Sequence, residues 1–208
     1  MAAKRGEPFQ LALAELRRRL CEGAYPPGAR LAAAEVAGEL GLSATPVREA
    51  LARLAGEGLL DERRGEGAFV PGYSGPDVAD LYRLGLAHLE AALRIPGGGA
   101  PRLQATAMRP EDAAAAVTAA DRLLAEWIAG AAGRRLTQSF LRLQRQLGPV
   151  RRLEPRCFSD LLEEWLDLAG AGEPRERLAL GRAFYRRRVR AAARLADLSA
   201  RATDRPAL

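Results

Sequence analysis

Residues 41–60 read GLSATPVREALARLAGEGLL, and this stretch decides the fold of the first part of the chain. Ser43 suits the N-cap of a helix, and Pro46 suits its first turn, where a missing N–H costs no hydrogen bond. Apolar residues then recur at the spacing of one helical face, namely Val47, Ala50, Leu51 and Leu54. The stretch therefore predicts an amphipathic helix that begins at Ser43 and ends near Gly56 and Gly58.

The segments on either side of this helix add two more helices and a hairpin. Residues 8–22 form a first helix, with leucines at helical spacing at Leu11, Leu13, Leu16 and Leu20. Residues 32–40 form a short second helix, which Gly41 ends from the C′ position. Residues 59–70 read as a two-stranded hairpin with a basic, glycine-containing tip. Three helices and a hairpin within roughly 70 residues follow the order of a winged helix-turn-helix.

The sequence after the hairpin predicts a second domain. Residues 71–76, PGYSGP, have the composition of a linker. Helical patterns alone follow, over residues 77–93, 110–131, 134–147, 157–169 and 174–200. We therefore expect a mostly α protein, with a winged helix-turn-helix at residues 1–72, a linker at 73–76 and an antiparallel α-helical bundle at 77–208.

Composition limits the class of protein. Of the 208 residues, 48% are hydrophobic but only 5% aromatic, which favours a helical Ala/Leu core. Cys21 and Cys157 lack the CxxC spacing of a metal or redox site, and no apolar run reaches the length of a membrane span. We expect a cytoplasmic protein with no membrane contact.

The net charge of +6 is distributed unevenly. Residues 1–73 hold ten Lys/Arg and ten Asp/Glu, so the whole excess lies in residues 74–208. An anionic partner is plausible for such a chain. Because the first domain is neutral as a whole, any argument for DNA binding must come from local arrangement.

The helix at 43–56 carries polar residues suited to a major groove. Ser43, Thr45 and Arg48 lie near its N-terminus, where small side chains allow close approach and the helix dipole attracts phosphate. Arg53 could reach the DNA backbone or pair with Glu49. At the hairpin tip, Arg63, Arg64 and Gly65 could follow a phosphate strand or enter the adjacent minor groove. The alternative is that these arginines are solvated or paired and that the hairpin is a plain cap.

The motifs from Gly23 to Val70 resemble the winged-helix domain of the GntR family of bacterial transcription regulators. They read GAYPPGARL, then GLSATPVREALARLAGEGLL, then RRGEGAFV, and the TPVREAL heptad is specific. The resemblance implies that Ser43, Thr45, Arg48, Arg64 and Gly65 occupy DNA-contacting positions. Two departures imply weaker binding or an altered operator. Ala44 stands where the family usually has Arg, and residues 32–34 are alanines where a further basic residue is common.

The helical part resembles, more diffusely, the FCD-type effector-binding and dimerisation domain of the same family. That resemblance implies a divalent metal held by one Asp and three His in many members. Asp121 matches the Asp, but Ala125 stands at the first His position and the chain's single histidine, His88, lies on another helix. We therefore expect no metal and no cofactor, and we expect Asp121 to pair with a nearby arginine.

A small anionic effector could still enter the bundle, because arginines suit carboxylates and phosphates. The candidate pocket residues are Asp121, Trp127, Arg142, Arg182 and Tyr185. The alternative is that the aromatic residues fill the core while the arginines face solvent. In that case the bundle would serve for dimerisation alone.

The sequence thus predicts a regulator that binds a two-half-site operator in double-stranded DNA as a homodimer. Repression and ligand response are what the family resemblance implies. The alternative is a sequence-tolerant nucleic-acid binder that uses the basic C-terminal helix, including Arg186–Arg188. No phosphate loop, catalytic constellation or metal-ligand set is recognised, so an enzyme is not expected.

Overall fold

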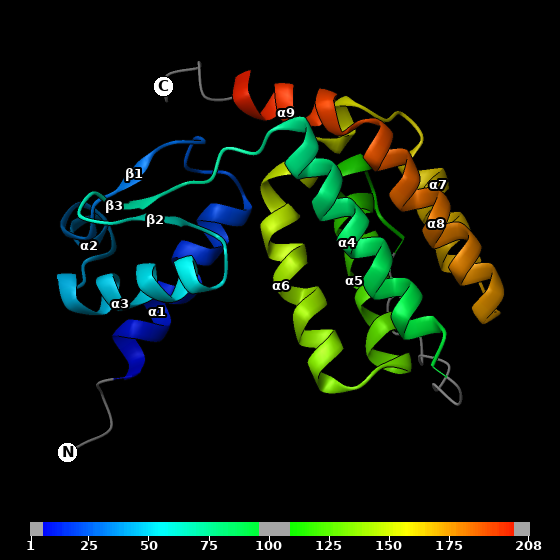
Figure 1. Cartoon of the computed structure of the whole chain (residues 1–208), viewed down its shortest axis with the longest axis horizontal. Helices are drawn as coiled ribbons and strands as arrows, with labels where there is room; N and C mark the ends of the chain where they lie inside the picture. Colours follow the sequence, from blue (N-terminus) through cyan, green and yellow to red (C-terminus); the bar gives the residue numbers. More distant parts are fainter. Residues whose placement is uncertain (1–5, 96–108, 202–208) are drawn as a thin grey trace. The chain divides into compact units, whose positions relative to one another are not determined.

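The computed structural model of the chain describes residues 6–95 and 109–201. The chain divides into two compact units (Figure 1). Of the described residues, those up to Tyr73 and Ser199–Arg201 form the first, and those within Ser74–Leu198 form the second. Helices dominate both units, and the strands are confined to one small sheet. The predicted mostly α fold class is confirmed.

The N-terminal unit contains three helices and a three-stranded antiparallel sheet. Its elements are α1 (Gly6–Cys21), β1 (Arg30–Leu31), α2 (Ala33–Leu40), α3 (Ala44–Gly56), β2 (Asp61–Arg63) and β3 (Gly67–Phe69). The order across the sheet is β1-β3-β2, with Glu62 opposite Ala68 in the hairpin. Strand β1 was not predicted, because two residues are too short to show the alternation that marks a strand.

The core of this unit forms where α3 packs against α1 and α2. The four apolar residues predicted for the inner face of α3 are all buried, and Leu16 and Leu20 of α1 join them. Leu11 was expected on the same face of α1 but is 57% exposed, because its helical position points away from α3. Removal of the other side chains from water stabilises the unit through the hydrophobic effect.

The turn between α2 and α3 positions the start of α3. Gly41 has φ +64°, a left-handed conformation that glycine adopts at little cost, and the N–H of Leu42 bonds to the carbonyl of Ala37 at 2.9 Å. Ser43 follows in an extended conformation and is the N-cap residue, as predicted, although its side chain makes no capping hydrogen bond. Ser43 is exposed at the tip of α3.

The C-terminal unit is entirely helical over the described residues. Its elements are α4 (Gly75–Leu93), α5 (Ala113–Ala131), α6 (Arg134–Arg151), the 3-10 turn η2 (Glu154–Arg156), α7 (Leu161–Gly170), α8 (Pro174–Arg190) and α9 (Ala192–Arg201). Helix α4 packs against α8, α6 and α5, and α7 covers α5 (Figure 1). No helix in the described ranges is both long and apolar enough to cross a membrane.

The start of α4 lies inside the segment expected as a linker. Ser74 accepts a hydrogen bond from the N–H of Asp77, whose carboxylate accepts one from the N–H of Ser74. This reciprocal capping box starts the helix at Gly75.

Two helix predictions in this unit were wrong in part. The helix predicted over 174–200 is two helices, which meet at Ala191. No Pro or Gly marks this break in the sequence. The break lies next to Ala193, and Gly75 of α4 packs closely against Ala193. The helix predicted from Cys157 begins only at Leu161, because η2 and a buried Phe158 occupy the preceding residues.

Candidate nucleic-acid interface

Helix α3 presents a polar face at its N-terminal end. Ser43, Thr45 and Arg48 are all exposed, while Val47 and Leu54 on the opposite face are fully buried. The buried residues fix the orientation of the helix, so the three polar side chains are held toward solvent together. The arrangement fits a helix that offers its N-terminus and an arginine to a major groove.

The hairpin of β2 and β3 forms the wing. Its turn includes Arg64 and Gly65, both exposed, and Gly65 has φ +80°. The guanidinium of Arg63 lies 4.2 Å from the centre of the Phe69 ring, a cation–π contact that keeps its charge along the hairpin. The wing tip therefore carries two arginines, of which Arg64 extends from the turn itself.

Arg53 lies one turn further along α3 and has a protein partner. Its Nε donates to Glu57 at 2.9 Å, and Arg17 of α1 donates to the same carboxylate. The alternative pairing with Glu49 is not the one formed. Since Glu57 is buried and shared by two arginines, it anchors α3 to α1. Arg53 is still exposed enough to reach a backbone phosphate.

A concave surface of about 480 Å³ lies between α3 and the wing. Small residues of α2 and α3 line much of it, and Arg48 and Arg30 are among its lining residues. Arg30 belongs to β1, and its Nε would lie 3.5 Å from a Cβ placed on Gly67 of the wing. Arg30 is thus a candidate contact that sequence reasoning missed, since only the unpredicted strand β1 brings it beside the wing.

The residues predicted for an effector pocket have varied surroundings. Arg142 is exposed, whereas Trp127 and Tyr185 are buried in the bundle. Arg182 donates to Glu90 at 2.7 Å. Asp121 forms an ion pair with Arg151, as expected for a helix residue beside an arginine. Asp121 and Arg182 each have a partner of opposite charge within the protein.

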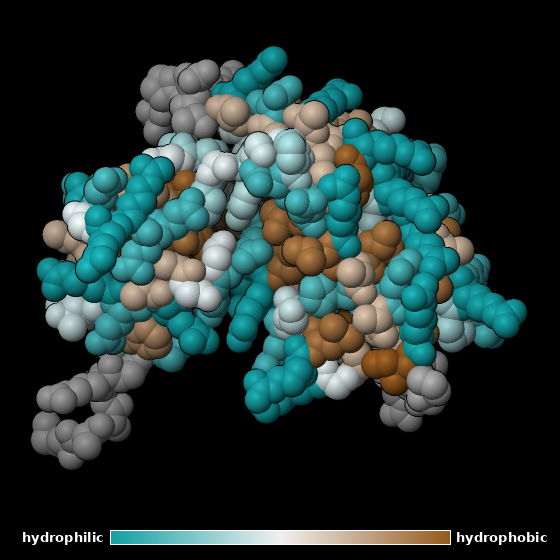
Figure 2. All heavy atoms as spheres, in the orientation of Figure 1, coloured by the Kyte–Doolittle hydropathy of each residue, from teal (hydrophilic) through white to brown (hydrophobic). Residues whose placement is uncertain are grey.

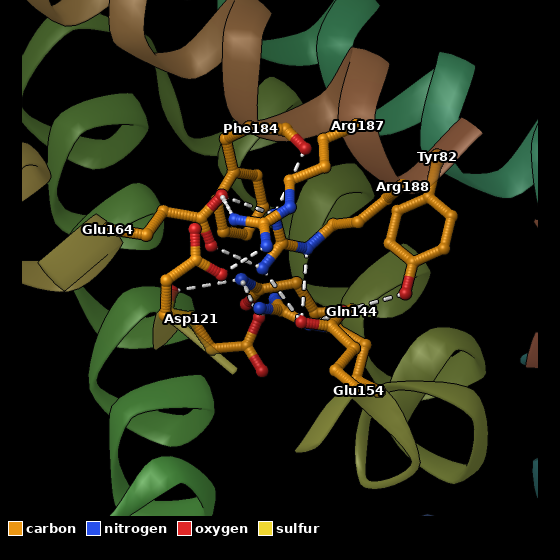
Figure 3. A network of polar contacts seen from close by, with 10 residues as sticks. Tyr82, Asp121, Gln144, Glu154, Glu164, Phe184, Arg187 and Arg188 are labelled. Atoms are coloured by element: carbon orange, nitrogen blue, oxygen red, sulfur yellow. Dashed lines mark hydrogen bonds and ion pairs between the residues drawn. The ribbon is translucent and has the colours of Figure 1, made fainter. Parts of the chain in front are cut away.

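The interior of the bundle holds a buried polar network centred on Arg188 (Figure 3). Arg188 is fully buried and donates to Glu154 at 2.8 and 3.0 Å and to Glu164 at 2.7 and 3.0 Å. Its guanidinium stacks 3.3 Å from the centre of the Phe184 ring. The hydroxyl of Tyr82 donates to Glu154 at 2.8 Å. These contacts join α4, η2, α7 and α8.

Arg151 extends the network to α5. Its Nε donates to Glu154 at 3.1 Å, and its other end pairs with Asp121. Gln144 donates to the carbonyl and the carboxylate of Asp121 at 2.9 and 3.1 Å. In the arginine run at 186–188, which the sequence offers as a possible nucleic-acid-binding face, Arg188 is buried and Arg187 pairs with Asp160.

The residues around Asp121 do not fit a metal ion. The guanidinium of Arg151 already forms an ion pair with the carboxylate of Asp121, and its positive charge would repel a divalent cation at this position. His88 is engaged elsewhere, with Ser139 at 2.9 Å and the carbonyl of Leu84 at 2.7 Å. Within the described part of the chain, no group of three or more His, Cys, Asp or Glu could hold a metal.

The network predicts a loss of stability in acid. Burial alone would raise the pKa of Glu154, but the charges of Arg151 and Arg188 and the hydrogen bonds from Arg188 and Tyr82 lower it. A carboxyl whose pKa is lowered by folding stabilises the protein above its unfolded pKa, about 4.5, and this stabilisation is lost as the pH falls through the folded value. Urea unfolding followed by tryptophan fluorescence should show a stability that falls below about pH 4.5. Glu154→Gln should be less stable at neutral pH and lose less on acidification.

Comparisons with known proteins agree with the geometry of α3 and the wing. Residues 10–70 match the family model described as bacterial regulatory proteins, gntR family. An uncharacterised HTH-type transcriptional regulator of Agrobacterium vitis is 35% identical over 88 residues, which are 42% of this chain and 47% of the relative. The match thus spans about half the length of that curated relative. The family model and this relative are both described as regulatory proteins.

Two solved structures share the fold over most of the chain. E. coli McbR/YncC has a TM-score of 0.67 at 19% identity, covering 90% of this chain and 98% of its own. A transcriptional regulator GntR from Rhodococcus sp. RHA1 has a TM-score of 0.68 at 19% identity, with 90% and 96% covered. At such identities the likeness concerns the fold alone. Residues 10–70 of this chain therefore match the model of the gntR family of bacterial regulatory proteins and have the winged helix-turn-helix fold.

Proposed function

We propose that the chain is a cytoplasmic transcription regulator that binds double-stranded DNA through its N-terminal unit. The observation that carries this proposal is the exposed row of Ser43, Thr45 and Arg48 at the N-terminal end of α3, beside a concave surface that ends at the wing. Helix α3 would enter the major groove, and a phosphate strand would pass between α3 and the wing, near Arg30 and Arg64. Ala44 offers no guanidinium, so the base contacts rest mainly on Arg48.

The regulator would act as a homodimer on two half-sites, with repression as the outcome. Members of the gntR family typically bind DNA as dimers. In the C-terminal unit, apolar residues gather on the face where α4 and α6 run side by side (Figure 2). Leu84 of α4 is 50% exposed. Burial of apolar surface of this kind is what homodimer interfaces provide.

Arg48→Ala tests the proposed reading of DNA. We expect the affinity for an operator upstream of the chain's own gene to fall about 10- to 100-fold, because a bidentate arginine–guanine contact is worth about 1–3 kcal/mol. Random DNA should lose less, since only a charge contact is removed there. Fluorescence anisotropy at moderate salt measures both affinities, and the titration end point should give two chains per operator.

Arg18→Ala is the matched control for that experiment. It removes the same charge from the same unit, but Arg18 lies on α1 and pairs with Glu15 and Glu22. Its operator affinity should stay close to that of the unchanged protein. Equal affinity of the unchanged protein for the operator and for random DNA would exclude specific recognition.

The structure weighs against the alternative of a sequence-tolerant binder that relies on the arginine run of α8. Arg188 is buried, and Arg187 is paired with Asp160 and Glu164, so of residues 186–188 Arg186 is the exposed cation, with Arg190 one turn further along α8. With two of its three arginines buried or paired, this run offers fewer phosphate contacts than a backbone-only binder needs. The reading helix α3 remains the better supported site.

A further inference from the structure

A shallow pocket of about 360 Å³ lies where α8 ends and α9 begins, outside the buried network. We call it the junction pocket. Its lining residues are Cys157, Phe158, Arg187, Arg190, Ala191 and Arg194. It is separate from the five residues that the sequence predicted for an effector. Its volume is near the lower end for small-molecule sites, which are about 300–1,000 Å³.

The charge of the junction pocket is positive. Three arginines line it, and no carboxylate among the described residues does. Arg187 is neutralised by Asp160 and Glu164 and lies 4.3 Å from the centre of the Phe158 ring. Arg190 and Arg194 have no ion pair with any carboxylate in the described ranges. Two guanidinium groups thus face a common hollow without a counter-charge from the described protein.

The surroundings hold Arg194 in place and add further positive charge. Arg194 donates to the carbonyl of Arg156 at 3.1 Å, which places its guanidinium at the edge of the pocket. The side chain of Arg156 is exposed beside the pocket. Like charges collected in this way repel one another, and a bound anion would relieve that repulsion.

The protonation of the Cys157 thiol favours non-covalent ligand binding in the junction pocket over covalent chemistry. Burial raises the pKa of this thiol, and the charge of Arg194 opposes that effect only in part. The neutral thiol is a poor nucleophile and behaves as a small apolar group. With Phe158 and Ala191 it supplies an apolar wall below the arginines.

We propose that the junction pocket binds a small oxyanion, a carboxylate or phosphate group on a compact ligand, with Arg190 and Arg194 as its direct partners. The planar guanidinium groups match both oxyanions with paired hydrogen bonds. The apolar wall of Phe158, Ala191 and Cys157 accommodates a short carbon stem. Arg187 stays paired with Asp160 and lines the pocket beside Phe158.

The position of the pocket couples ligand binding to DNA binding, a step that rests on the function proposed above. Arg194 follows Ala193, and a Cβ placed on Gly75 would lie 3.1 Å from the Cα of Ala193. Gly75 is the first residue of α4, directly after the segment that leaves the wing. Ligand binding at the α8–α9 junction would therefore act on the start of α4 and alter DNA affinity.

The test uses the full chain with inorganic phosphate and with succinate, each against sodium chloride at equal ionic strength. Thermal unfolding is followed by the fluorescence of Trp127 and Trp165, which both lie in the C-terminal unit. At about ten times Kd, at least one of the two anions should raise Tm by about 3–5 °C. The choice of anion distinguishes a phosphate ligand from a carboxylate ligand.

Arg190→Ala and Arg194→Ala should each abolish the rise in Tm, while Arg186→Ala should keep it. Arg186 is an exposed arginine of the same helix that does not line the pocket, so it matches the charge change. An equal response of all variants, or an equal rise with chloride, would overturn the site. A loss of DNA affinity in Arg190→Ala without any anion response would assign these arginines to DNA instead.

The same samples separate the two proposals. Operator affinity measured with and without the anion should change in the unchanged protein and in Arg186→Ala but not in Arg190→Ala. Anion binding that leaves operator affinity unchanged would overturn the link through Gly75 and keep the site. Operator binding without any anion response would overturn the site and leave the proposed function intact.

Discussion

Arg188→Met is expected to lower the free energy of unfolding of the C-terminal unit by about 3–5 kcal/mol, the cost of breaking a buried ion pair from one side. Arg188 is fully buried and donates to both Glu154 and Glu164. Methionine would fill part of the space without the charge, so Glu154, itself fully buried, would keep only Arg151 as a counter-ion. Urea unfolding followed by tryptophan fluorescence measures the change, because both tryptophans lie in this unit.

Two further variants separate the charge effect from simple loss of volume. Arg187→Met, whose side chain is 31% exposed, should cost less than about 1 kcal/mol. Arg188→Met combined with Glu154→Gln should recover part of the loss, because no uncompensated carboxylate is then buried. Unfolding of Arg188→Met at the same urea concentration as the unchanged protein would contradict the stabilising role of the network.

Gly85→Ala is expected to lower the same free energy of unfolding by about 1–3 kcal/mol, the usual cost of an overpacked core. A Cβ on Gly85 would lie 2.4 Å from Cε1 of Tyr185 and 2.9 Å from its Cζ. Tyr185 is buried, and its ring packs edge-on against Phe184 with centroids 5.2 Å apart, so it has little room to move. The clash should outweigh the better helix propensity of alanine, about 1 kcal/mol.

Two other glycines of the unit serve as controls in the same urea titration. Gly170→Ala, with no atom within 4 Å of the new Cβ, should leave the unit as stable or slightly more stable. Gly181→Ala would meet Cδ2 of Leu89, the end of a flexible side chain, and should cost less than Gly85→Ala. If Gly85→Ala matched Gly170→Ala, the close packing of α4 on α8 would not be the reason for glycine at position 85.

The reading helix could be predicted from sequence because its signals are local. Ser43, Pro46 and the apolar spacing that ends at Leu54 all lie within four turns of one helix, and the structure has α3 where they indicate. Gly41 likewise marks the end of α2 through a conformation that few other residues adopt. The wing could be predicted because the helical spacing of apolar residues stops after Leu60.

The bundle interior could not be predicted in the same way, because its partners are far apart in the chain. Arg188 stands in a run of arginines that reads as solvent-facing, and Glu154 and Glu164 are 34 and 24 residues away. Only the packing of α7 and η2 against α8 brings them together. The contribution of Arg30 is also non-local, since it depends on a strand of two residues pairing with β3.

The buried ion pairs of Arg188 with Glu154 and Glu164 restrict how this chain can evolve. The three residues belong to α8, η2 and α7, and Arg188 offsets part of the negative charge that the two glutamates bring into the bundle. A substitution at one of these positions destabilises the protein until a second substitution compensates for it. Single substitutions at these positions are therefore expected to be selected against. Descendants of this sequence are expected to keep the set whole or to lose it together, whereas exposed residues such as Arg142 can vary one at a time.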